Sequence, residues 1–260
     1  MTSPDAPRSR LVDGLRLGLT TFTIAPVRPG AVDRPAARVA MATAGAYGLA
    51  IGALAGALAI GLRAADAPAL LTSAVVVGVA TLASRGLHLD GLADTVDALG
   101  SYGDRDRALA IMKSPEIGPF GVVAIVFALV IPIAAIDGLL DRPWWAVLAA
   151  TAVGYGAGRV AATWACRVGE PAARPDGLGA LVAGTVPWPA AVVASIVVGA
   201  LAVPAVPHRP WQGPVAVVAA LAATAAVTAH LRRRIGGVTG DTLGACVEIG
   251  TAVALIGVAW

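Results

Sequence analysis

Three aspartates follow a histidine at short intervals in the run His88-Leu-Asp90-Gly-Leu-Ala-Asp94-Thr-Val-Asp97. If this run is helical, Asp90, Asp94 and Asp97 sit at positions i, i+4 and i+7, which places three carboxylates on one face. Like charges at this spacing destabilise a bare helix, so we expect a cation to offset them. Mg²⁺ takes carboxylate oxygens and keeps waters and substrate phosphates in its other positions. The spacing therefore predicts a site for magnesium and a phosphate-bearing substrate, with a solvated acidic face as the alternative.

Two other side chains of the same segment are suited to such a site. His88 lies two residues before Asp90, so it is a candidate base or hydrogen-bond donor, or else a structural histidine. Lys113 can meet a phosphate as a point charge, or it can lie among lipid headgroups. We therefore expect residues 86–118 to form an acidic catalytic loop.

Two later segments carry residue types that suit an anion. In Arg174-Pro-Asp-Gly-Leu-Gly, the guanidinium of Arg174 can fork onto a phosphate, and the glycines allow close backbone approach. In Gly236-Gly-Val-Thr239-Gly-Asp241, a flexible turn with a hydroxyl at Thr239 places Asp241 at the start of an apolar stretch. Helix N-termini attract phosphate, so Asp241 is either a fourth metal ligand or a helix cap.

Two charges interrupt otherwise apolar stretches. Arg159 and Glu248 are predicted at similar depths within two membrane spans, and Glu248 lies seven residues beyond Asp241 on the same helical face. Charges inside a membrane normally face the bundle interior and have partners. We expect an Arg159–Glu248 pair, which either is structural or lines a substrate cavity.

The elements that position these residues follow from composition. The chain has 260 residues, of which 57% are hydrophobic and 13% charged, and its mean hydropathy is +0.78. A soluble domain usually carries about a quarter charged residues, so the bilayer is the natural solvent for this chain. Runs of about 20 apolar residues must cross a membrane as helices. The predicted fold is a single all-α domain over residues 1–260, a polytopic membrane helical bundle with about seven spans. These are Val39–Leu62, Ala67–Ser84, Ile117–Ile136, Pro143–Cys166, a span from about Val186 to Pro207, Pro210–Ala229 and Thr242–Trp260.

The basic residues are distributed unevenly between the two sets of loops. One set, which includes the N-terminal tail and all three candidate segments, carries 15 Lys and Arg, whereas the other carries three. By the positive-inside rule the first set is cytoplasmic, so the N-terminus is inside and the C-terminus outside. Residues 1–38 form a cytoplasmic segment, in which residues 13–27 are apolar enough for an interfacial helix. The net charge of +3 is too small to indicate nucleic-acid binding.

Taken together, these motifs resemble the cobalamin synthase family, also called adenosylcobinamide-GDP ribazoletransferases. The resemblance rests on motifs that occur in the same order along nearly the whole chain: Phe22-Thr23 followed by Pro26, Gly86-Leu-His-Leu-Asp-Gly-Leu-Ala-Asp-Thr-Val-Asp97, Ile111-Met-Lys113, Ile117-Gly-Pro-Phe-Gly121, Arg174-Pro-Asp-Gly-Leu-Gly179 and Gly236-Gly-Val-Thr-Gly-Asp-Thr-Leu-Gly244. One departure is that Ser114 stands where the family pattern usually has an aspartate, and Glu116 lies two residues further on.

The resemblance implies a Mg²⁺-dependent transferase of the inner membrane that completes the nucleotide loop of vitamin B12. Such an enzyme joins α-ribazole, or its 5′-phosphate, to adenosylcobinamide-GDP and releases GMP. The resemblance is compatible with a homo-oligomer, or with an association with other enzymes of nucleotide-loop assembly. Carried over by motif, Asp90, Asp94, Asp97 and Asp241 are the metal and phosphate residues. The predicted catalytic residues are His88, Asp90 and Asp94, with His88 or one aspartate as the proton acceptor. The predicted substrate-binding residues are Lys113, Arg159, Arg174, Thr239 and Glu248.

Three other classes of membrane protein share part of this pattern. Aromatic prenyltransferases have two aspartate-rich motifs, whereas this chain has one such cluster. CDP-alcohol phosphotransferases have Asp-Gly followed by Ala-Arg, and here Asp90-Gly91 is followed by Ala93-Asp94. A transporter would have inverted repeats and midplane charges, but no clear repeat is present and most acidic residues are predicted at the cytoplasmic face.

Overall fold

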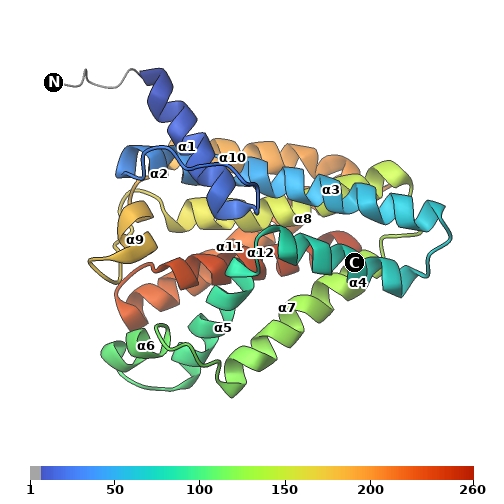
Figure 1. The fold of residues 1–260 in the computed structure, drawn as a ribbon. Helices are drawn as coiled ribbons and strands as arrows, with labels where there is room; N and C mark the ends of the chain where they lie inside the picture. Colours follow the sequence, from blue (N-terminus) through green and yellow to red (C-terminus); the bar gives the residue numbers. More distant parts are fainter. Residues whose placement is uncertain (1–6) are drawn as a thin grey trace.

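The computed structural model describes residues 7–260, and this part of the chain is all helical, as predicted (Figure 1). The first six residues of the predicted N-terminal segment lie outside the described part. The α-helices are α1 (Pro7–Phe22), α2 (Arg34–Ala42), α3 (Ala44–Ala64), α4 (Ala69–Ala83), α5 (Leu87–Gly100), α6 (Arg105–Ile111), α7 (Pro119–Asp137), α8 (Trp144–Ala165), α9 (Gly177–Val182), α10 (Trp188–Leu201), α11 (Gln212–Ile235) and α12 (Gly240–Ala259), and a 3-10 turn, η1 (Val203–Ala205), follows α10.

The membrane spans are fewer than the seven predicted. Five helical segments are long and apolar enough to cross a membrane: α3, α7, α10 with η1, α11 and α12. A sixth candidate is α4 taken together with α5, although the two are bent by 88°. These helices keep large apolar side chains exposed, as a lipid-facing surface requires, for example Leu54, Phe127, Ile196 and Val218. The polytopic membrane bundle is therefore confirmed, with five or six candidate spans.

The predicted span at Pro143–Cys166 forms α8, which lies in the centre of the bundle and is not apolar enough to count as a span. Other helices cover it, so 16 of its 22 residues are buried, and small residues replace large apolar ones. On its neighbour α3, Gly48, Gly52 and Gly56 recur every four residues, and a Cβ at the first two would collide with the α8 backbone. Small residues at this spacing let two helices pack closely.

The segment 86–118, which we expected to be a loop, is mostly helical and forms α5 and α6. Arg85 and Gly86 both adopt left-handed backbone conformations, with φ of 58° and 68°, and they turn the chain between α4 and α5. Glycine adopts this conformation without strain. Because of the turn, α5 leaves the direction of α4 and runs across one end of the bundle (Figure 1), so we treat α5 as lying outside the spanning helices.

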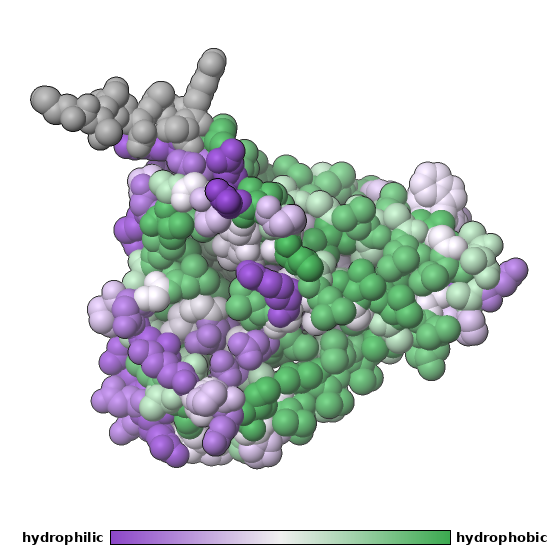
Figure 2. All heavy atoms as spheres, viewed as in Figure 1, coloured by the Kyte–Doolittle hydropathy of each residue, from purple (hydrophilic) through white to green (hydrophobic). Residues whose placement is uncertain are grey.

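This end of the bundle, where α5, α6, α9 and the loop 236–239 lie, is called the polar end below. Figure 2 shows that hydrophilic residues gather at the end that holds α6 and α9, whereas hydrophobic residues cover most of the remaining visible face. The predicted interfacial segment 13–27 is helical up to Phe22, at the end of α1. All three segments singled out in the sequence therefore meet on one side of the membrane bundle.

Candidate active site

Two glycines bring α5 into direct contact with α12. A Cβ on Gly91 would lie 2.8 Å from the carbonyl oxygen of Asp241, and a Cβ on Gly244 would lie 2.8 Å from the carbonyl oxygen of His88. Any larger residue would push the two helices apart, because the atoms in the way belong to the backbone. Helix α5 therefore packs with its aspartates beside the first turn of α12. Gly91 and Gly244 both lie inside the motifs of the sequence, but their local sequence does not predict this contact.

Two of the predicted aspartates, Asp90 and Asp241, line the same cavity, whose volume is about 210 Å³. Asp94 lies one turn further along α5 and is partly buried. Burial, and then the negative charges of Asp90, Asp241 and Asp97, raise the pKa of Asp94 to about 6. The crowding of like charges that the spacing predicted is therefore present, and it includes a residue from α12.

Asp97 has a different environment, because it is buried and both of its carboxylate oxygens already accept hydrogen bonds. The amide of Gly118 donates to one oxygen at 2.7 Å, and the amide of Gly121 donates to the other at 2.8 Å. These amides belong to the start of α7, whose positive dipole end favours a negative charge. Asp97 thus fastens the end of α5 to the start of α7. Nearby, Ser114 and Glu116 line a cavity beside Asp97 and do not line the cavity that Asp90 and Asp241 share.

The loop before α12 is held in place by the loop before α9. A parallel bridge joins Ala172 to Val238, in which the amide of Ala173 donates to the carbonyl of Val238 at 2.9 Å. Arg105 of α6 adds to this tie, because it donates to the carbonyls of Ile235 at 2.9 Å and Ala173 at 2.7 Å. Nothing in the local sequence of Arg105 indicates this role.

These ties create a second cavity, of about 340 Å³, which has cationic and hydroxyl groups in its wall together with the carboxylates of Asp176 and Asp241. Lys113, Arg174, Thr239 and Asp241 all line it. The guanidinium of Arg174 donates to the carbonyl of Leu109 at 2.7 Å, while its buried Nε has no hydrogen-bond partner. A guanidinium has five N–H donors in a geometry suited to phosphate. An anion in this cavity could therefore accept hydrogen bonds from the N–H groups of Arg174 that do not bind Leu109.

Thr239 caps the helix that carries Asp241. Its hydroxyl accepts a hydrogen bond from the amide of Thr242 at 3.1 Å, and its own amide donates to the hydroxyl of Thr242 at 2.9 Å. This reciprocal capping box fixes the start of α12. Thr239 therefore has a structural role and also lines the second cavity, and its hydroxyl donates a hydrogen bond to the carboxylate of Asp241 at 3.3 Å.

His88 is almost fully buried at the start of α5. Its ring stacks on Phe22 with the centroids 5.6 Å apart, and its Nδ1 has no hydrogen-bond partner. Burial, together with the positive charge of Arg159, lowers the pKa of His88 to about 3, so the imidazole is neutral. His88 lines the same cavity as Asp90 and Asp241, as its sequence position suggested.

Arg159 and Glu248 do not line either of the two cavities around Asp241. Arg159 and Glu248 are close enough for each charge to act on the other, as expected. They make no direct contact, because the ion pairs within the described residues are Arg105–Asp106 and Arg167–Glu170. Arg159 is fully buried on α8 and lies over the ring of Tyr155, 5.5 Å from its centroid. A cation over an aromatic face is attracted by the electrons of the ring. The substrate-binding roles of both charges remain predictions.

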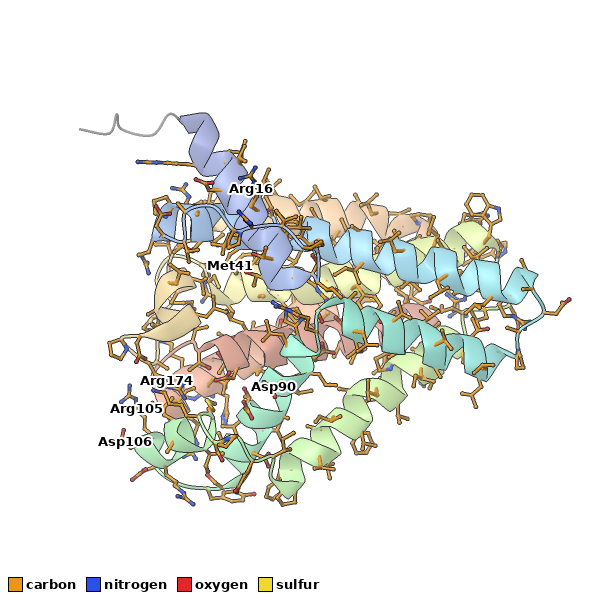
Figure 3. All side chains as sticks on the ribbon, viewed as in Figure 1. Arg16, Met41, Asp90, Arg105, Asp106 and Arg174 are labelled. Atoms are coloured by element: carbon orange, nitrogen blue, oxygen red, sulfur yellow. The ribbon has the colours of Figure 1, made fainter. Side chains whose placement is uncertain are left out.

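The described residues contain no three His, Cys, Asp or Glu side chains arranged to hold a metal ion by themselves. Magnesium does not need such a cage, since proteins commonly bind it through one or two carboxylates while substrate phosphates and waters complete the shell. Asp90 and Asp241 supply hard oxygen donors from two helices, and the phosphate-suited cavity adjoins Asp241. The donor set therefore fits magnesium bound together with a phosphorylated ligand. Figure 3 shows Asp90 and Arg174 at the same end of the bundle.

Several known proteins are similar to this chain along most of its length. An adenosylcobinamide-GDP ribazoletransferase of a Nocardioides species is 40% identical over 95% of this chain and 98% of its own length. Proteins of the same name from Frankia casuarinae and Corynebacterium efficiens are 38% and 34% identical, over 93% and 95% of this chain and 92% and 90% of their own lengths. No solved structure matches the chain. The model of the cobalamin-5-phosphate synthase family matches residues 14–259, and the chain therefore belongs to that family.

Proposed function

We propose that this protein joins α-ribazole, or its 5′-phosphate, to adenosylcobinamide-GDP and releases GMP. The observation that carries this proposal is the meeting of Asp90 and Asp241 at one cavity, next to a second cavity lined by Lys113 and Arg174. A pyrophosphate substrate needs a site for a cation beside positively charged side chains, and this arrangement supplies both. The family membership favours this transferase over the prenyltransferase, CDP-alcohol and transporter alternatives.

Asp90 and Asp241 are the residues that would hold Mg²⁺. When bound, the ion neutralises charge on the pyrophosphate oxygens. Asp97 is less suited, because both of its oxygens already accept amide hydrogen bonds. Its proposed role is to keep α5 in position. This division of roles uses fewer carboxylates than the four suggested by motif, in keeping with the small number that magnesium usually takes.

The chain's own residues then position the reaction. Arg174 and Lys113 bind the phosphates in the second cavity, so that the phosphorus nearest cobinamide faces the aspartates. A ribose hydroxyl of α-ribazole attacks this phosphorus; the new oxygen–phosphorus bond forms as the bond to the GMP oxygen breaks. Asp94 accepts the proton of the hydroxyl, since its pKa of about 6 lies nearer to neutral pH than that of His88.

We also infer that the polar end faces the cytoplasm, where nucleotide substrates are made. The positive-inside rule supports this orientation, because Arg232, Arg233 and Arg234 all end α11 there. In sealed right-side-out vesicles, a cysteine introduced at exposed Arg233 is then expected to resist an impermeant thiol reagent. Labelling of this cysteine without detergent would show that the polar end faces outward, opposite to the inferred orientation.

The proposed function is tested by measuring GMP release from adenosylcobinamide-GDP by detergent-purified protein, with and without α-ribazole and Mg²⁺. We expect release only when both are present. In Asp241→Asn, the Mg²⁺ concentration for half-maximal rate should rise at least tenfold, because one carboxylate is lost. In Asp94→Asn, we expect a loss of 10²-fold or more that added Mg²⁺ does not restore, because the proton acceptor is missing.

Asp141→Asn is the matched control, since this aspartate is exposed in the loop between α7 and α8, away from the polar end. It should leave rate and Mg²⁺ dependence unchanged. Retained activity in folded Asp94→Asn would remove Asp94 from the mechanism. Absence of GMP release from the wild-type protein under all conditions would refute the proposed function itself.

A further inference from the structure

A groove that takes no part in the proposed reaction runs between α8 and α11. It consists of two adjoining cavities, of about 410 Å³ and 230 Å³, which share Arg167, Ala225 and Thr228 in their walls. None of the residues in these walls lines either cavity around Asp241. Ala225 and Ala229 are exposed on α11, which is long and apolar enough to cross a membrane. The groove therefore opens on the lipid-facing surface of the bundle.

The larger cavity, at the end of α11, carries a net positive charge. Three arginines line it: Arg167 follows the end of α8, and Arg232 and Arg233 belong to the last turn of α11. Glu170 is the one acidic side chain among the described residues in this wall, and its buried carboxylate is already paired with Arg167. The formal charge is therefore +2, and the partial charges of the two helix C-termini reduce it by only about one. This charge favours an anion as the ligand.

Two of the three guanidinium groups are available to bind an anion. Arg232 and Arg233 are exposed, and their side chains make no hydrogen bond or ion pair with another described residue. The next arginine, Arg234, instead donates to the carbonyl of Gly103 at 3.0 Å and so fastens α11 to the loop before α6. Guanidinium groups bind phosphate oxygens through pairs of N–H donors. Arg232 and Arg233 are therefore suited to a phosphate group.

The smaller cavity continues the groove along α11 and is mainly apolar. Its wall is formed largely by uncharged side chains of the two helices, which are Ala161, Trp164, Ala165, Leu221 and Ala225. The indole N–H of Trp164 donates to the hydroxyl of Ser195 at 2.9 Å. The hydroxyls of Thr224 and Thr228 donate to carbonyls of α11 at 2.9 and 2.8 Å. Because these donors are already used within the protein, the smaller cavity offers a ligand mainly apolar contact.

The length of the groove matches one leaflet of a bilayer. Leu221 precedes Arg232 by 11 residues on α11, which corresponds to about 16 Å at 1.5 Å per residue. The hydrocarbon core of a bilayer is about 30 Å thick, so the groove extends from the charged end of α11 through about half of that core. An acyl chain of a lipid lies over the same depth.

We propose that this groove binds one molecule of an anionic phospholipid, with its phosphate among Arg167, Arg232 and Arg233 and an acyl chain between α8 and α11. A free phosphate would occupy only the charged cavity, whereas a lipid occupies both. An ammonium headgroup would bring a positive charge to a cavity whose carboxylate is already paired, so an anionic headgroup is favoured over a zwitterionic one. Basic pockets between membrane helices commonly bind such headgroups.

The test measures the binding of phosphatidylglycerol and of phosphatidylcholine with the same acyl chains to detergent-purified protein, by native mass spectrometry. We expect one tightly bound phosphatidylglycerol, with a Kd at least tenfold below that of phosphatidylcholine. An arginine near the membrane surface contributes about fivefold to the affinity for an anionic lipid. The double variant Arg232→Gln/Arg233→Gln should therefore raise the Kd of phosphatidylglycerol at least tenfold and that of phosphatidylcholine by about threefold or less. Ala225→Phe, whose ring would fill the smaller cavity, should raise the Kd of both lipids at least fivefold.

The matched controls lie outside the groove. Arg16→Gln/Arg38→Gln removes two exposed arginines of α1 and α2, and Ala222→Phe adds a ring at an exposed position of α11. Both controls should bind lipid as the wild-type protein does. Since all the substituted positions are exposed, the variants should fold.

Three results would overturn the proposal. The first is an equal Kd of the two lipids for the wild-type protein, and the second is an equal loss of binding in either groove variant and its control. The third is displacement of phosphatidylglycerol by glycerol phosphate at equal concentration, which would show that the acyl chain contributes nothing. These measurements involve no turnover, so their outcome is independent of the proposed function.

Discussion

The contact between α5 and α12 predicts that Gly244→Ala will reduce activity more than stability. The added methyl group would lie 2.8 Å from the carbonyl oxygen of His88 and 3.1 Å from its Cα. Ordinary contact begins at about 3.4 Å, so α5 and α12 must separate by about 0.6 Å at this point. The atoms that block the methyl group belong to the backbone and cannot rotate away. The separation therefore moves Asp90 relative to Asp241.

The size of each effect follows from this displacement. Overpacking usually destabilises a protein by about 1–3 kcal/mol, while replacing glycine with alanine inside a helix returns about 1 kcal/mol. The expected net loss of stability is therefore small, about 0–2 kcal/mol. A misplacement of about 1 Å can reduce a reaction rate by about 10²-fold, so 0.6 Å should reduce kcat by roughly tenfold.

The assay is the rate of GMP release at saturating substrates, measured beside thermal unfolding of the same detergent-purified variant. Gly199→Ala is the matched control, because this glycine lies within α10 and a Cβ there would meet nothing within 4 Å. It should keep full activity. Full activity in folded Gly244→Ala would refute the reasoning, since it would mean that the spacing of α5 and α12 does not position the aspartates.

Two further predictions concern the aspartates of α5. Asp97→Asn replaces one of the two carboxylate oxygens that accept amide hydrogen bonds with an NH₂ group, so the free energy of unfolding should fall by about 1.5–3 kcal/mol. An unchanged thermal midpoint would contradict the role of Asp97 in fastening α5 to α7. The pKa of Asp94, raised to about 6 from its ordinary value of 3.8, predicts that kcat/KM rises with pH through about 6. Between these two pKa values the folded state keeps a proton on Asp94 that the unfolded state has lost, so the free energy of unfolding without Mg²⁺ should fall as pH rises from about 4 to 6. A flat pH profile in the wild-type protein would exclude the raised pKa of Asp94. The same slope in Asp94→Asn would exclude it as well.

The spans were largely predictable because transfer into a bilayer depends on local composition. The exception is α8, whose central position could not be read from its own sequence, since Gly and Ala fit a helix surrounded by others as well as one in lipid. The spacing of the aspartates placed them on one face only on the condition that α5 is helical, and the segment that contains α5 was expected to be a loop. That α5 turns by 88° from α4 was not predictable, because the turn depends on two left-handed residues, of which only Gly86 has a type that favours this conformation.

Within the site, residue types identified the candidates but not their separate roles. Asp90, Asp94 and Asp97 looked equivalent in the sequence, yet only the packing of α7 shows that Asp97 is already bound by two backbone amides. Arg159 and Glu248 looked like partners by depth, and their charges do act on each other, but only side-chain packing shows that Arg159 lies over Tyr155. Such differences arise from contacts between distant segments, which a local pattern does not contain.

The sequence by itself determined that this is an all-helical membrane protein with carboxylates gathered on one helix face. These properties depend on hydrophobicity and periodicity, which act between residues close in the chain. Only the tertiary structure decided which carboxylates share a cavity and which apolar side chains lie beside them. Asp90 meets Asp241 because Gly91 and Gly244 let two helices from distant parts of the chain touch, and the apolar wall is completed by α1 and α2.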